Sequence, residues 1–195
     1  MSDNKNEHLV TAVFDSKDKA AEAAQALKDW DKANEDIKLG ALSVLTKNEK
    51  GKIETTNYGS RQTGKGAKIG VIVGAIAALL SGGLTLVGGV IGGAALGALG
   101  GSLRKQGLGL SEDDLKALAT ELDAGHAALL VMCDDAEVEA TTAELTTLGG
   151  KTESKPVSDE AVQQAEQALT TAAEKGADKS SSSETAATDD TTKST

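Results

Sequence analysis

The chain has 195 residues, a length that is enough for one domain and an appendage, and its formal net charge is −10. This acidic balance argues against nucleic-acid binding, and three aromatic side chains are too few for a base-stacking platform. A single cysteine, Cys133, excludes an intrachain disulfide and fits a reducing cytoplasm. Residues 1–7 are polar and contain no signal-peptide apolar region, so we expect the soluble part to face the cytoplasm.

Charge and glycine are distributed unevenly along the chain. The stretch from Thr55 to Ser111 contains sixteen of the 22 glycines and no acidic residue, whereas the remainder carries 15 basic and 30 acidic residues. Five basic residues flank the apolar centre of this stretch, a context that favours lipid headgroups or solubilisation over nucleic acid. These flanking cations are Arg61, Lys65, Lys68, Arg104 and Lys105.

Residues 7–60 are expected to form the first half of an α+β domain. Alanine and leucine recur near helical spacing after residue 17, whereas the segments on either side are β-type runs. The expected elements are a strand at 8–14, a helix at 17–32 capped by Asp15 or Ser16, a strand at 39–46, a turn at 48–51 and a polar edge strand at 52–57.

The segment 61–106 contains two ladders of small residues at four-residue spacing. This spacing places each ladder on one face of a helix, where glycine lets a second helix approach closely. Ser81-Gly82-Gly83 separates two apolar arms, so we expect a glycine-zipper helical hairpin through which copies of the chain associate. The zipper positions are Gly66, Gly70, Gly74 and Ala78 in the first arm and Gly89, Gly93, Gly97 and Gly101 in the second.

The lengths of the two arms leave their environment open. Residues 66–80 would form a helix roughly 22 Å long and residues 84–103 one of roughly 30 Å. A bilayer core is about 30 Å thick, so only the second arm is long enough unless lysines of the first snorkel. A hairpin would bring the flanking cations to one side, the positive-inside arrangement. The alternative is a hairpin buried in protein.

Residues 107–157 are expected to form the second half of the α+β domain, after a linker at 107–110. The run 127–133 is continuously apolar, which predicts a central strand covered on both faces. Before this strand we expect a helix that Ser111 and Asp114 cap, with Leu115, Leu118 and Leu122 on one face and Gly125 after its end. After the strand we expect a helix that Asp134 or Asp135 caps, with Val138, Leu145 and Leu148 inward. An edge strand is expected at 151–157.

A weak internal repeat indicates how the two halves combine. Residues 8–27 and 126–145 align without gaps as a strand, an acidic cap and an alanine-rich helix. Two such halves are typical of a ferredoxin-like α+β sandwich, here interrupted by the apolar hairpin. Residues 158–175 are expected to form at most a lone, weakly amphipathic helix, and residues 176–195 a disordered tail.

Motifs that would indicate catalysis fail on inspection. Gly59-xxxx-Gly64-Lys65-Gly66 matches a P-loop at all but one position, since Gly66 stands where the Ser or Thr that binds Mg²⁺ should follow the lysine. Two histidines, His8 and His126, could be neighbours in the aligned halves, but without carboxylate or thiol partners they make a poor metal site. No nucleophile, base and orienting group can be assembled. We therefore expect no enzyme activity, no cofactor and no metal.

Three segments follow one another in a characteristic order: HLVTAVFDSKDKAAEAAQAL, then GAKIGVIVGAIAALL with GGVIGGAALGALGG, then LSEDDLKALATELDAGHAALLVMCDD. This order, over roughly residues 7–157, resembles that of an uncharacterised bacterial family, domain of unknown function 1269. Members of the family are labelled membrane proteins of unknown function and are sometimes linked to general stress proteins. The resemblance implies a ferredoxin-like domain interrupted by a glycine-zipper hairpin, and it implies no catalytic residues.

From the sequence we expect a non-enzymatic protein that associates with itself and with a lipid bilayer. Its location would be the bacterial inner membrane, with the soluble domain facing the cytoplasm. The alternative is a cytoplasmic homo-oligomer that buries the hairpin between subunits. Neither a nucleic-acid partner nor a small-molecule substrate is indicated. A pore is a third possibility, but Ser81, Thr85 and Ser102 supply too little polar surface for a lumen.

Overall fold

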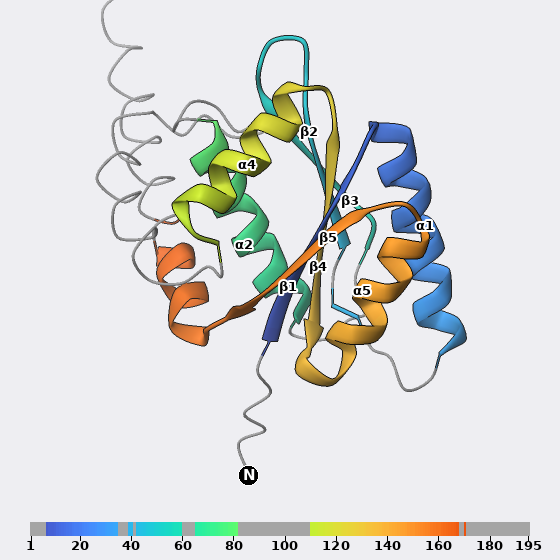
Figure 1. Cartoon of the computed structure of the whole chain (residues 1–195). Helices are drawn as coiled ribbons and strands as arrows, with labels where there is room; N and C mark the ends of the chain where they lie inside the picture. The colour runs from blue at the N-terminus through green and yellow to red at the C-terminus, as the bar shows by residue number, and fades with distance from the viewer. Residues whose placement is uncertain are drawn as a thin grey trace, which may run out of the picture.

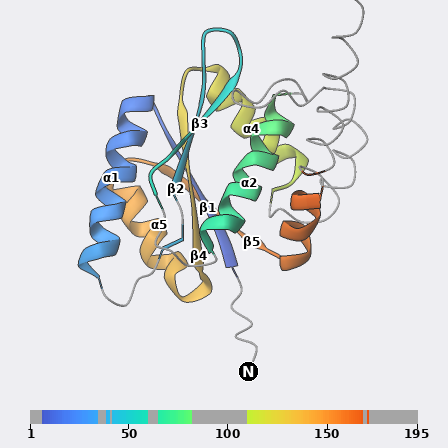
Figure 2. The ribbon, with the colours of Figure 1, turned by 180° about the vertical axis from the view of Figure 1, so that it is seen from behind.

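A computed structural model of the chain shows an α+β fold in which helices cover both faces of one sheet (Figures 1 and 2). The model describes residues 7–34, 39–40, 42–59, 65–81, 110–167 and 170. The zipper positions of the second arm, the cations Arg61, Arg104 and Lys105, and the tail 176–195 lie outside the described residues. The side chains of Lys65 and Lys68 and the surroundings of Gly66 lie outside them as well.

Five strands form one antiparallel sheet in the order β3-β2-β4-β1-β5. The two edge strands, β3 and β5, are the two polar runs that the sequence places at edges, and this prediction is confirmed. The strands are β1 (Glu7–Phe14), β2 (Leu42–Lys47), β3 (Ile53–Asn57), β4 (Ala127–Asp134) and β5 (Lys151–Val157).

The two strand–helix units of the repeat interleave in this sheet. β4 lies between β1 and β2, and β1 lies between β4 and β5. Helix α1 (Lys17–Ala33) connects β1 to β2, and a short 3₁₀ turn (Asp135–Glu137) followed by α5 (Val138–Thr147) connects β4 to β5. Both helices cover the same face of the sheet, as Figures 1 and 2 show from opposite sides.

Helix α1 is held to the sheet by small and apolar side chains at helical spacing. Ala20, Ala24 and Leu27 are fully buried in a cluster with Phe14 of β1 and with side chains of β2 and β4. The Ser16 hydroxyl accepts a hydrogen bond from the Lys19 N–H at 3.3 Å, which is the expected N-cap. Local capping and an amphipathic face therefore specify this layer.

The opposite face is covered by α2 (Lys65–Leu80), by α4 (Glu112–Asp123) and by helical residues 159–167. The capping pair of α4 is present, because the Ser111 hydroxyl accepts from the Asp114 N–H and the Asp114 carboxylate accepts from the Ser111 N–H. Gly125 follows α4 with a φ of 86°, so the expected glycine C-cap is also confirmed.

Strand β4 divides its side chains between the two cores. Alternation sends Leu130 and Met132 to the α2 and α4 side and Leu129 and Cys133 to the α1 and α5 side. All four side chains are 1% exposed or less. The sequence predicted a central strand covered on both faces, and the structure confirms it.

Two expected elements differ from those observed. Strand β2 begins at Leu42 rather than Leu39, since the Leu39 N–H donates to the buried Asp31 carboxylate at 2.9 Å instead of joining a ladder. Helical residues 159–167 are not isolated. Ala161, Val162 and Ala165 are buried in the core with α2 and α4, because the chain leaves the end of β5 on the face of the sheet that these helices cover.

Candidate functional site

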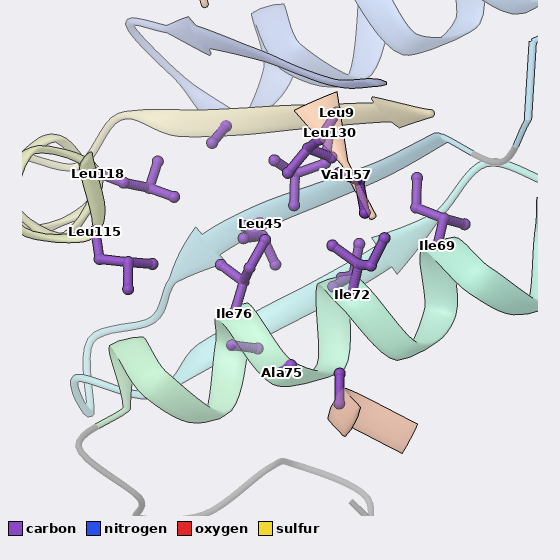
Figure 3. Close-up of a cluster of buried hydrophobic side chains, with 14 of the residues drawn as sticks. Leu9, Leu45, Ile69, Ile72, Ala75, Ile76, Leu115, Leu118, Leu130 and Val157 are labelled. Atoms are coloured by element: carbon purple, nitrogen blue, oxygen red, sulfur yellow. The ribbon is translucent and has the colours of Figure 1, made fainter. Parts of the chain in front are cut away.

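Helix α2, the first arm of the expected hairpin, lies on its own sheet. Ile69, Ile72 and Ile76 are 1% exposed or less and point from α2 toward the sheet, where Leu45 and Leu130 lie (Figure 3). The spacing of three and four residues puts these isoleucines on one side of the helix. The sequence treats 61–106 as a segment apart from the α+β domain, but its described helix completes the second layer of that domain.

The glycines of the first ladder lie off the side of α2 that contacts the sheet. Gly70 is exposed, and a Cβ built there meets no heavy atom within 4 Å. Gly74 is half-buried, whereas Ala78, at the end of the ladder, is 6% exposed. Two faces of α2 thus differ: isoleucine contacts the sheet, and glycine opens outward at Gly70. The ladder's role in helix packing stays a prediction.

Membrane crossing was expected from the apolar character of this region. The described helix of this region is α2, which has 16 residues. Within the described residues, no helix combines the length and the apolar character needed to cross a bilayer.

A groove on the same side of the sheet as α2 lies between α4 and strands β1 and β5. Its volume is about 380 Å³. Apolar side chains from three segments contribute to it, together with a polar group from each of the two strands and from the helix. The lining residues are Thr11 and Val13 of β1; Leu110; Asp114, Ala117, Leu118 and Glu121 of α4; and Lys151, Thr152 and Glu153 of β5.

Ion pairs connect the helix and the strand that border the groove. The Lys155 ammonium lies 2.7 Å from a Glu153 oxygen and 3.5 Å from an Asp114 oxygen. A Glu121 oxygen lies 3.8 Å from the Lys151 ammonium, and the other Glu121 oxygen is hydrogen-bonded to the His126 ring. Three carboxylates and two ammonium groups therefore line or adjoin one groove.

The charged forms of these groups are favoured by their neighbours. The Ser111 backbone N–H, with Lys155 nearby, lowers the pKa of the Asp114 carboxyl. The His126 hydrogen bond, with Lys151 nearby, lowers the pKa of Glu121, and the Glu153 carboxylate raises the pKa of Lys155. All three groups are ionised at neutral pH, so the groove is an electrostatically charged site.

The side chain of Thr11 is a buried polar group in the groove lining. Thr11 is 9% exposed, and its hydroxyl has no hydrogen-bond partner in the described part of the chain. Thr11 is paired in register with Glu153 on the neighbouring strand, so both side chains emerge on the α4 side of the sheet. A buried hydroxyl without a partner is unfavourable in free protein, which makes this position noteworthy.

The two histidines are not neighbours. Antiparallel pairing of β1 with β4 sets His8 opposite Cys133 and Phe14 opposite Ala127, so His8 and His126 lie at opposite ends of the sheet. His8 pairs with Asp135 at 3.0 Å, and His126 pairs with Glu121. Among the residues that the structure describes, no group of three or more His, Cys, Asp or Glu side chains is placed to hold a metal ion.

Sequence reasoning did not identify the groove. A usable signal was present in β5, a short edge strand. Lys151, Glu153 and Lys155 occupy every second position of this strand and therefore lie on one face. Asp114 and Glu121 are two helical turns apart, which places them on one face of α4. What the sequence could not indicate was that these two charged faces meet.

The fold and the groove define an α+β protein with a five-stranded antiparallel sheet and a charged groove beside one helix. A family model described as "Protein of unknown function (DUF1269)" matches residues 65–172, more than half of the chain. The chain belongs to this family. No curated protein and no solved structure matches it.

Proposed function

We propose that this protein is a non-enzymatic, self-associating protein whose association surface is the outer face of α2 together with the glycine-rich residues that follow it. The observation that carries the proposal is Gly70, which is exposed and has open space where a Cβ would lie. A helix of a second copy could approach this backbone closely, because no side chain intervenes.

The difference between the two sides of α2 supports this proposal. The isoleucine side of the helix is already used in the sheet core, and Val73, Ala77 and Ala78 are buried as well. The part of α2 open to a partner is therefore centred on Gly70, with Gly74 half-buried one turn further on. Residues 69–80 contain no charged residue, in contrast to the exposed side of α1, which carries Lys17, Asp18 and Glu22. An uncharged outer face is typical of a helix that contacts another apolar surface.

Strand order supports a finer description of the scaffold as a ferredoxin-like sandwich. Within the five-stranded sheet, β5, β1, β4 and β2 follow one another in the order produced by two interleaved strand–helix–strand units. In this description β3 is an added edge strand. The helix α2 is an added element on the face that α1 and α5 leave open.

The proposed association is tested by placing a large side chain at the open glycine. Gly70→Leu in the full chain is expected to shift the oligomer to a smaller species in sedimentation velocity, because the added side chain separates the helices. The matched control is Ala143→Leu at an exposed position of α5, which adds a side chain of the same kind on the other face of the sheet and should leave the oligomer size unchanged. An unchanged oligomer in Gly70→Leu and in Gly93→Leu with Gly97→Leu would overturn the proposal.

Association with a bilayer through residues 84–103 is a second candidate. It is supported by twenty residues without a charge, followed directly by Arg104 and Lys105. The test is centrifugation of lysed cells that express the untagged chain. Recovery in the pellet, with release by detergent but not by salt, is the expected result. Recovery of the native protein in the detergent-free supernatant would overturn this candidate and leave self-association as the function.

A further inference from the structure

The groove between α4 and strands β1 and β5 has the size and composition of a small-ligand site. A volume of about 380 Å³ falls in the range of about 300–1,000 Å³ that such sites occupy. Val13, Ala117 and Leu118 supply apolar surface, and carboxylates supply fixed charge. This combination of an apolar lining and a few polar groups is typical of sites for amphipathic small molecules.

Thr11 is the observation that points to an occupant. Its side chain is more than nine-tenths buried, lines the groove and has no hydrogen-bond partner among the described residues. Most buried hydroxyls in folded proteins are paired, because an unpaired one loses its bonds to water without replacement. The hydroxyl oxygen is itself shielded in the free protein, so a ligand donor would supply the missing bond once the threonine side chain rotates toward the groove.

The charges around Thr11 select the sign of that ligand. Glu153 is the register partner of Thr11, so a carboxylate and a hydroxyl oxygen lie on adjacent strands facing the same side. The same ion pairs engage the lysines and the carboxylates, Lys155 with Glu153 and Asp114, and Lys151 with Glu121. Three carboxylates against two ammonium groups leave the groove with a net negative charge. An ionised carboxylate has about four acceptor sites, so an added ammonium group still finds acceptors, whereas an added anion meets the negative excess.

We propose that this groove binds a small primary amine with an apolar body. The ammonium group donates to the Thr11 hydroxyl and to the Glu153 carboxylate, and the apolar body lies against Val13, Ala117 and Leu118. This binding site is separate from the association surface on the outer face of α2, so the two proposals stand or fall independently.

The experiment titrates the full ¹⁵N-labelled chain with hexylamine and follows backbone amide shifts. Hexanoate and hexan-1-ol are the probes with reversed and with no charge. Hexylamine is expected to shift the amides of Thr11, Ala117 and Glu153, whereas hexanoate and hexan-1-ol are expected to bind at least about tenfold more weakly. Absence of shifts with hexylamine, or equal binding of hexanoate, would overturn the proposal.

Variants test the two polar groups separately. Glu153→Gln should weaken hexylamine binding about tenfold through loss of a charge-assisted hydrogen bond. Glu139→Gln is the matched control, because Glu139 is an exposed carboxylate on α5, across the sheet from the groove. Equal loss of affinity in both variants would indicate bulk charge and would overturn the assignment to the groove.

Thr11→Val removes the hydroxyl and keeps the shape of the side chain. It should weaken hexylamine binding about threefold to tenfold while raising the Tm of the free protein by about 2–4 °C, since the unpaired buried hydroxyl is gone. A merely structural hydroxyl would give a lower Tm and unchanged affinity, which would overturn the role of Thr11. Ala117→Phe, made at an exposed position of α4, should block the groove without altering the sheet.

Discussion

The two faces of the sheet are covered by helices of different character. On one face, α1 and α5 each follow directly from the strand before them, and the outer side of α1 is charged and exposed. On the other face, α2 carries isoleucine toward the sheet and an exposed glycine away from it, while α4 leaves a groove beside β5. The first layer packs on the sheet through α1 and α5, whereas the second layer combines core packing with an exposed glycine and a groove.

This difference also separates two uses of glycine. Gly150, next to the α1 and α5 core, is closely surrounded, and a Cβ there would lie 2.8 Å from the Phe14 ring. Gly70, on α2, has nothing within 4 Å of the same position. Glycine at 150 is needed for packing within the chain, but glycine at 70 is not. Gly70 is therefore a position at which packing within the described fold does not require glycine.

The largest effect on stability is expected from a cavity in the core between α2 and the sheet. Ile76→Ala should lower the free energy of unfolding by about 2–5 kcal/mol, because Ile76 is fully buried between α2 and the sheet. Urea unfolding followed by the fluorescence of Trp30, the single tryptophan, measures this value. Val71→Ala, at a half-buried position of the same helix, should cost about 1 kcal/mol. Equal, small costs would show that α2 is not part of the folding unit.

The next effect tests the close packing at the first face. Gly150→Ala should destabilise the protein by about 1–3 kcal/mol, since the added methyl group would also lie 3.1 Å from the Leu145 carbonyl oxygen, which belongs to the backbone. Calorimetric unfolding checks this prediction. A neutral substitution would mean that the first layer relaxes as readily as the second, and the contrast between the two layers would fail.

A smaller, pH-dependent effect is expected at the start of α4. The folded pKa of Asp114 is lowered, so its carboxylate stabilises the protein above about pH 4 and loses that contribution as the pH falls through the folded value. Asp114→Asn should therefore cost about 0.3–1 kcal/mol at neutral pH and less as the pH falls through that value. Urea titrations across this pH range measure the difference. A cost independent of pH would exclude the carboxylate charge as its source.

The smallest effect has the opposite sign. Gly70→Ala should stabilise the folded chain by about 0.5–1 kcal/mol, because alanine favours the helix and meets no neighbour. Thermal unfolding at low protein concentration isolates this effect from association. Destabilisation of the dilute protein would indicate that the outer face of α2 is occupied within the chain itself, and the contrast with Gly150 would disappear.

Much of the local structure could be predicted from the sequence, because it depends on near neighbours in the chain. Apolar periodicity and capping pairs located α1, α4 and β4, and the first apolar arm, expected at 66–80, is helical as α2 (Lys65–Leu80). The Ser111 and Asp114 cap is specified by two residues three positions apart. Such features are independent of the rest of the fold.

Only the tertiary structure decided what each face of these elements contacts. An apolar helix has the same sequence signature whether it faces lipid, another subunit or its own sheet, and here the described arm faces its own sheet. The groove likewise depends on β5 lying beside β1 and below α4, three segments far apart in the chain. Local sequence determines periodicity and caps, whereas the choice among alternative buried surfaces depends on non-local packing, which no single segment encodes.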